Sequence, residues 1–216
     1  MDWTYPERVF GPGLDAPVLR ALWRSGTQLT GAQVHRLAGT GSERGVRYAL
    51  DRLVTQGIVT RGSVGASHVY ALNPEHLAYP AVDAALRALD PWRTLSQRTS
   101  ALVRDSLPPV VRGEQLVAHE VAVSVFGSVA RGTADDESDL DLLVVMPDDV
   151  TGGEELADRL EVEGRRWTGQ RVQVYLTTRG DLVRARDAGD PVVTSFRADA
   201  RRIHGPSVDD LLRPAA

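Results

Sequence analysis

Two residue types are missing from this 216-residue sequence, cysteine and lysine. Without cysteine, the chain has no disulfide framework, no zinc-thiolate site and no thiol nucleophile. All 25 basic residues are arginine, so lysine Schiff-base chemistry and the lysine of a Walker-type phosphate loop are excluded as well.

The sequence also lacks long apolar runs. No stretch approaches the roughly 20 apolar residues that cross a bilayer, although hydrophobic residues make up an ordinary 42% of the chain. Residues 1–7 have neither the basic start nor the apolar segment of a signal peptide. We therefore expect a cytoplasmic protein with no membrane partner, long enough for two modest domains or one large one.

The most informative segment lies in the second half of the sequence. The apolar run 121–126 predicts a buried strand, and residues 140–146 predict the next one. Between them, Gly127 and Ser128 open a tight turn into a short helix. Gly127 lets the backbone approach a phosphate group, and Ser128 offers a hydroxyl and N–H groups at a helix start.

Two aspartates stand at the beginning of the second predicted strand. Because side chains alternate along a strand, Asp139 and Asp141 point to the same face. Two carboxylates on one face can share metal ions, and oxygen ligands suit Mg²⁺ or Mn²⁺. The alternative is that both acids are solvated residues of a half-exposed strand and that the Gly-Ser pair is only a turn.

Gly-Ser followed after ten residues by Asp-x-Asp resembles the DNA polymerase β-like nucleotidyltransferase superfamily, especially its minimal members. The resemblance implies that Asp139 and Asp141 are catalytic and hold Mg²⁺, and that Gly127 and Ser128 hold the phosphates of an NTP. It also implies transfer of an NMP to a protein, RNA or small-molecule acceptor. Minimal members commonly serve as antitoxins, so a toxin is one expected protein partner.

One position departs from the pattern of that family. Active members carry a third acid on a following strand, and in the best counterpart here, residues 171–176, Gln173 takes its place. An amide has no charge and cannot act as a general base, although its oxygen can accept a hydrogen bond or coordinate weakly. We therefore count Gln173 as a nucleotide-binding candidate only. If the strand is shifted in register, Glu161 or Glu163 is the fallback acid.

Arg131 lies three residues after Ser128, in or just beyond the first turn of the short helix. We expect it to bind a nucleotide phosphate through its guanidinium. An ion pair with Asp135, Asp136 or Glu137 is an equal alternative.

The first 75 residues are the more basic part of the chain, with eight arginines against six acidic residues. Caps and apolar periodicity predict three helices there, over residues 16–24, 30–37 and 43–56. A hairpin follows, with strands over 58–61 and 67–72 and a loop at 62–66. Thr30 and Ser42 are the expected caps of the second and third helices.

Three helices followed by a hairpin, over residues 15–73, resemble the winged helix-turn-helix of small bacterial transcription regulators. The resemblance places the third helix in the major groove of double-stranded DNA and makes the hairpin the wing. The DNA-binding candidates are Ser42, Glu43, Arg44, Arg47, Tyr48, Arg52, Arg61, Ser63 and His68. The alternatives are a module that binds protein, or arginines that only solvate the helix.

The predicted fold is a two-domain α/β (α+β) protein. A winged helix-turn-helix over residues 1–73 is joined by a helical linker, residues 74–109, to a polymerase β-like nucleotidyltransferase fold over 110–216, with a small mixed sheet flanked by helices. Pro91 separates two helices of the linker, and Pro108-Pro109 marks the domain boundary. The linker helices either form a homodimer or pack as a simple connection.

Further helices are expected over residues 153–167, 181–188 and 192–202, and a strand over 170–177. Two functions remain open. One is a DNA-binding nucleotidyltransferase; the other is a transcription regulator whose degenerate site senses a nucleotide or docks a partner.

Overall fold

The computed structural model describes residues 1–107, 111–112, 115–135 and 137–213. It divides into two compact units, one formed by Tyr5–Asp90 and the other by Met1–Thr4 together with Pro91–Ala216. The predicted linker 74–109 is therefore shared between the units, with the division next to the helix break expected at Pro91. The boundary predicted at Pro108-Pro109 lies outside the described residues.

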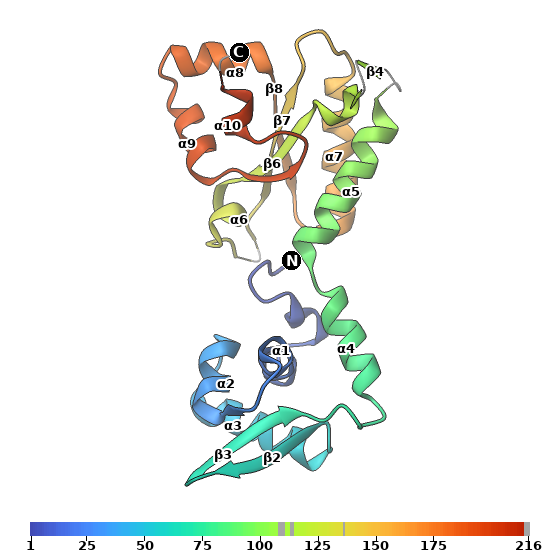
Figure 1. Ribbon diagram of the computed structural model, residues 1–216. Coiled ribbons are helices and arrows are strands. Elements are labelled where there is room, and N and C mark those ends of the chain that lie inside the picture. Colours follow the sequence, from blue (N-terminus) through green and yellow to red (C-terminus); the bar gives the residue numbers. More distant parts are fainter. Residues whose placement is uncertain (108–110, 113–114, 136, 214–216) are drawn as a thin grey trace. The chain divides into compact units, whose positions relative to one another are not determined.

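The first unit contains helices and a three-stranded sheet (Figure 1). Its elements are η1 (Pro6–Phe10), α1 (Asp15–Ser25), β1 (Leu29–Thr30), α2 (Gly31–Ala38), α3 (Glu43–Thr55), β2 (Val59–Val64), β3 (Ser67–Leu72) and α4 (Tyr79–Ala88). The strands are antiparallel in the order β1-β3-β2. The three predicted helices and the hairpin are present.

Local sequence signals explain where these helices begin. Thr30 accepts a hydrogen bond from the N–H of Gln33, whose side chain returns to the Thr30 backbone, and Ser42 accepts from the N–H of Gly45. The apolar stripes of α1, α2 and α3 then meet in one core. The predicted loop 62–66 is wrong, because strand pairing continues to Val64 opposite Ser67 and leaves only a two-residue turn.

The second unit is built on a four-stranded mixed sheet (Figure 1). Its elements are α5 (Pro91–Ser106), β4 (Val111–Arg112), β5 (Gln115–Leu116), η2 (Val117–His119), β6 (Ala122–Phe126), α6 (Gly127–Arg131), β7 (Leu140–Met146), α7 (Gly153–Thr168), β8 (Val172–Thr178), α8 (Arg179–Asp187), α9 (Pro191–Asp199), β9 (Arg201–His204) and α10 (Val208–Leu211). The order is β8-β7-β6-β9, with β7 and β8 parallel and the other pairs antiparallel. The predicted small mixed sheet flanked by helices is confirmed.

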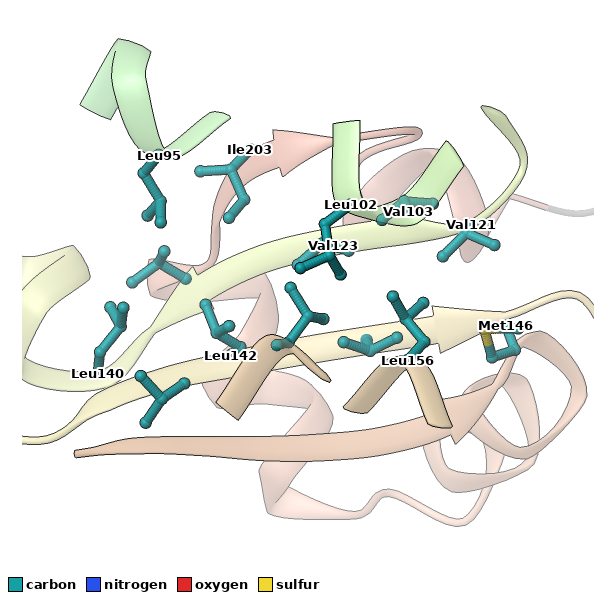
Figure 2. Close-up of a cluster of buried hydrophobic side chains, with 14 of the residues drawn as sticks. Leu95, Leu102, Val103, Val121, Val123, Leu140, Leu142, Met146, Leu156 and Ile203 are labelled. Atoms are coloured by element: carbon teal, nitrogen blue, oxygen red, sulfur yellow. The ribbon is translucent and has the colours of Figure 1, made fainter. Parts of the chain in front are cut away.

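Each face of this sheet buries its own apolar cluster. Alternate residues of β7 pack under α5 and α7, where Leu140 and Leu142 are almost fully buried (Figure 2). Val144 on the same strand is also almost fully buried. Leu143 and Val145 point to the opposite face, which α8, α9 and α10 cover. Side-chain alternation along β7 therefore assigns Asp141 to the face of α9.

One predicted helix is wrong in its last three residues. The expected helix over 192–202 ends at Asp199, and Arg201–His204 instead form β9, which pairs with β6. The backbone at Ala200 is extended, and the hydrogen bonds that β6 offers on its free edge decide the outcome against local helix propensity.

The N-terminal residues of the chain pack onto the second unit. The Trp3 ring lies 5.0 Å from that of Trp92, and its indole N–H donates to the side chain of Gln170. Within the part of the chain that the structure describes, no helix is both long enough and apolar enough to span a membrane.

Candidate functional site

The strand register brings Phe126, Asp141 and Gln173 into one row across the sheet. Phe126 is the partner of Asp141 on β6, and Gln173 is its partner on β8. Paired residues of neighbouring strands project to the same side of a sheet. Gln173 is thus level with the second aspartate, whereas Glu161 and Glu163 lie on α7, where Glu161 accepts a hydrogen bond from the N–H of Val174.

Asp139 reaches the same row from the loop before β7. The side-chain amide of Gln173 donates a hydrogen bond to Oδ2 of Asp139. An N–H group thus occupies the place beside this carboxylate where a cation is expected, and it brings only a partial positive charge. Rotation of the amide would present its oxygen to the same space.

The electrostatics of the pair favour a cation. Partial burial raises the pKa of Asp141, the negative charge of Asp139 raises it further, and the Arg131 guanidinium acts in the opposite direction. A raised pKa means that the folded chain disfavours the ionised carboxylate at this position. A divalent cation between the two carboxylates would remove the repulsion.

The two aspartates are only part of the ligand set that a metal ion needs. No group of three or more His, Cys, Asp or Glu side chains in the described residues is arranged to hold one. Mg²⁺ in nucleotide-dependent enzymes is usually bound by one or two carboxylates, with water and substrate phosphates completing its shell. Asp139 and Asp141 therefore fit a metal that arrives with a nucleotide, and do not form a complete protein cage.

The turn after β6 lies against the acid pair. Gly127 has a φ angle of +73°, and a Cβ atom built on it would lie 2.5 Å from Oδ2 of Asp141. Glycine is thus needed here both for the left-handed backbone and for the close approach of the carboxylate. The turn and the acid pair are parts of one site.

Ser128 is the second residue of α6, a helix of only five residues. No side chain among the described residues caps its first turn. The N–H groups at this end are consequently available to a ligand, whereas the dipole of so short a helix adds little.

Arg131, at the end of α6, pairs with an acid far along the chain and not with Asp135 or Glu137. Its guanidinium binds Oδ2 of Asp199, at the end of α9. The other oxygen, Oδ1 of Asp199, is buried and has no hydrogen-bond partner among the described residues. The alternative pairing with Asp135 or Glu137 is therefore wrong, and Asp136 lies outside the described residues.

Sequence reasoning missed three residues that support the site. Asp199 is one, because it lies 68 positions from Arg131. The other two are Trp3 and Gln170: the Trp3 indole donates to Gln170 at 2.7 Å, and Gln170 donates to the carbonyl of Ser138 at 2.9 Å. This chain of contacts fixes the backbone immediately before Asp139. No local pattern signals contacts between residues so distant in sequence.

The residues predicted to bind DNA lie on the exposed side of α3 and on the hairpin of the first unit. All of them are exposed: Ser42, Glu43, Arg44, Arg47, Tyr48, Arg52, Arg61, Ser63 and His68. The structure joins some of them to one another, since Arg44 donates to the Tyr48 hydroxyl at 2.8 Å and Ser63 lies 3.5 Å from His68.

Two of the predicted DNA-binding arginines have acidic partners in the structure. Arg52 binds Asp15, and Arg61 lies 3.7 Å from Asp51. Arg44 and Arg47 are therefore the better cationic candidates on this surface, while Arg52 is partly neutralised by its carboxylate.

Comparison with known proteins gives one family match, which lies within the second unit. The sequence model of the family described as "Nucleotidyltransferase domain" matches residues 113–204. Comparison with curated proteins gives no match. A solved structure entitled "Crystal structure of the toxin-antitoxin with AMP-PNP" is 22% identical, with 54% of this chain and 78% of that chain covered, at a TM-score of 0.34. That likeness is too slight to carry an argument. The family match and the mixed sheet support a nucleotidyltransferase domain over residues 113–204.

Proposed function

We propose that the second unit binds an NTP with Mg²⁺ or Mn²⁺ and transfers its NMP group to an acceptor hydroxyl. The observation that carries this proposal is the close approach of the turn at Gly127 to the carboxylate of Asp141, beside Asp139. In the reaction, the acceptor oxygen bonds to the α-phosphorus and the bond to the bridging oxygen breaks. Pyrophosphate leaves, and the acceptor proton passes to solvent.

Asp139 and Asp141 are the residues that would hold the metal. A divalent ion there would neutralise charge on the phosphate oxygens and on the leaving pyrophosphate. The backbone N–H groups at Gly127 and Ser128 bind the phosphates in this proposal. Gln173 orients Asp139 and contributes a neutral group, so removal of the acceptor proton has no carboxylate base at this position.

Arg131 supplies positive charge close to the acid pair. Its present partner is Asp199, so binding a phosphate requires the guanidinium to exchange one anion for another. The proposal therefore gives Arg131 two states, one on Asp199 and one on the nucleotide.

The acceptor class follows only from the family resemblance. A protein, an RNA end and a small molecule are all consistent with a half-buried acid pair at the start of an interior strand. Because minimal members of the resembled family commonly serve as antitoxins, we include an antitoxin-like role in this proposal. In that role a toxin is the acceptor or the binding partner.

A label-transfer assay tests the proposed activity. Each of four α-labelled NTPs is incubated with the protein, a cell extract and Mg²⁺ or Mn²⁺, and labelled protein and RNA are separated by size. Label that disappears when the metal is chelated supports the transferase and identifies the acceptor class. Metal-dependent NTP binding without any label in protein, RNA or small molecules would favour the nucleotide-sensing regulator instead.

Replacing Gln173 by aspartate is expected to strengthen the metal site. The new carboxylate would stand beside Asp141 in the row across the sheet and remove the N–H group now directed at Asp139. We expect metal-dependent NTP affinity to rise roughly tenfold, the scale on which neighbours of metal ligands act. Calorimetric titration measures this. Gln173→Asn is the control, because asparagine has the size of aspartate but no charge. An equal gain in NTP affinity in both variants would contradict the electrostatic explanation.

Gly127→Ala is expected to damage the site more than the fold. A methyl group at this position displaces the Asp141 carboxylate, and the φ angle of +73° adds strain of about 1–3 kcal/mol. Gly132→Ala is the matched control, because Gly132 has the same φ and no atom within 4 Å of a Cβ. Denaturant unfolding should show similar losses in the two variants. NTP binding should fall in Gly127→Ala alone, and an equal fall in Gly132→Ala would contradict a specific role for the turn.

For the first unit we propose binding of double-stranded DNA by a winged helix-turn-helix. What supports it is that α3 begins at a capped, exposed end and presents Arg44, Arg47 and Tyr48 to solvent. Arginine suits both phosphate contacts and guanine recognition in the major groove. A homodimer would place two such helices on a two-fold site, with a spacing set by the dimer.

A further inference from the structure

Three aromatic rings extend from the acid pair across the same face of the sheet. Phe126, the β6 partner of Asp141, contacts Phe196 of α9 with ring centroids 5.0 Å apart. Phe196 in turn contacts Tyr175 of β8, with ring centroids 5.3 Å apart and an angle of 61° between the planes. Both contacts are edge-to-face, the geometry that aromatic pairs prefer.

Strand register places Tyr175 next to the candidate metal site. Gln173 is level with Asp141, and Tyr175 is two residues further along the same strand, level with Leu143. Residues two apart on a strand share a face and are separated by about 6.6 Å. The distance suits a ligand whose phosphates lie at the acid pair and whose ring lies beside Tyr175.

The exposure of these rings separates their roles. Phe196 is only 1% exposed and belongs to the core under α8, α9 and α10, whereas Tyr175 is 44% exposed. The buried Phe196 ring thus contacts the Tyr175 ring, which is still open to solvent. Such an aromatic is fixed in orientation before a ligand arrives, which lowers the entropic cost of stacking on it.

We infer that Tyr175 is the stacking platform for a nucleobase at this site. The inference rests on the proposed nucleotide-binding function and extends it from the phosphates to the base. Every nucleobase has an aromatic face, so a single tyrosine stacks on any of them without selecting one. The base comes either from the donor NTP or from an RNA acceptor, since both supply the same chemistry.

Binding of two kinds of ligand to the full chain tests this inference. Mn²⁺ titrations with ATP, GTP, CTP and UTP report phosphates and base together, and inorganic tripolyphosphate reports the phosphates alone. A fluorescent single-stranded RNA tests the acceptor source. Tyr175→Leu keeps apolar cover over Phe196 but removes the aromatic face, and Tyr175→Phe keeps that face. Thermal unfolding verifies that both variants are folded.

Loss of one base–aromatic stack is expected to weaken binding about tenfold. The inference holds if Tyr175→Leu weakens NTP binding by that factor while tripolyphosphate affinity and the Tyr175→Phe variant stay near the wild type. The same loss confined to RNA assigns the platform to the acceptor. Unchanged NTP and RNA affinities, or an equal fall for tripolyphosphate, would overturn it.

The proposed function has its own control in the same experiment. If wild-type protein binds neither NTP nor tripolyphosphate with Mn²⁺, the metal-nucleotide site itself is wrong, and the nucleobase platform falls with it. If both ligands bind and depend on Asp139 and Asp141 but not on Tyr175, only the nucleobase platform is wrong.

Discussion

Replacing both Asp139 and Asp141 by asparagine is expected to abolish metal-dependent NTP binding. The two carboxylates are the negative charges that the proposed site offers to a divalent cation, and asparagine keeps their size while removing the charge. We expect affinity to fall by roughly 100-fold or more, since these groups would be direct ligands and even neighbours of ligands are worth 10–100-fold. Calorimetric titration with NTP and Mg²⁺ or Mn²⁺ measures the loss.

A control must carry the same change in net charge. Glu154→Gln with Glu155→Gln removes two carboxylates from the start of α7, away from the acid pair. This variant should bind NTP as the wild type does. If the two double variants behave alike, the role of Asp139 and Asp141 as metal ligands is excluded.

The stability of the double asparagine variant shows whether a loss of NTP binding comes from the missing carboxylates or from unfolding. Burial and the charge of Asp139 raise the pKa of Asp141, so the folded chain binds this proton more tightly than the unfolded chain does. Stability therefore decreases as pH rises from the ordinary aspartate pKa through the raised one, and the cost persists at neutral pH. Asparagine cannot ionise, so the variant should unfold at an equal or higher temperature than the wild type at neutral pH.

Arg44→Ala combined with Arg47→Ala is expected to remove DNA binding by the first unit. Both side chains are exposed on α3, and neither has an acidic partner among the ion pairs of the described residues. Base and phosphate contacts of arginine are worth about 1–3 kcal/mol each, so the pair should cost roughly 100-fold in affinity. Fluorescence anisotropy with DNA from upstream of the gene measures it at two salt concentrations.

The salt dependence adds a second criterion. If both arginines bind phosphates, the slope of log affinity against log salt should become shallower by about 0.9 for each phosphate that the variant no longer neutralises. Arg165→Ala with Arg166→Ala, on α7 of the other unit, removes the same charge and should leave DNA binding intact. Undiminished binding by the α3 variant would reject this helix as the recognition element.

Periodicity and caps were sufficient for most elements. β6, β7 and β8 lie near their predicted positions. These features are local, because alternation of apolar residues and the spacing of Gly-Ser from Asp-x-Asp are written in short segments. Thr30 and Ser42 likewise cap their helices through residues three positions away.

The failures lie where a distant segment decides the local structure. Residues 201–204 form a strand because β6 offers a free edge. The shared linker has the same cause, since α4 and α5 each belong to a different compact unit. None of these outcomes depends on the residues nearest in sequence.

By itself, the sequence determined the identity and spacing of the acid pair, the glycine turn, the replacement of a third acid by Gln173 and the arginines of α3. Only the tertiary structure decided that Arg131 binds Asp199, that Trp3 and Gln170 brace the backbone before Asp139, and that Phe196 holds Tyr175 beside the site. The physical reason is the sequence separation over which each kind of interaction acts. Caps, turns and strand alternation act over a few residues, whereas ion pairs, ring contacts and edge pairing join residues that become neighbours only when the chain folds.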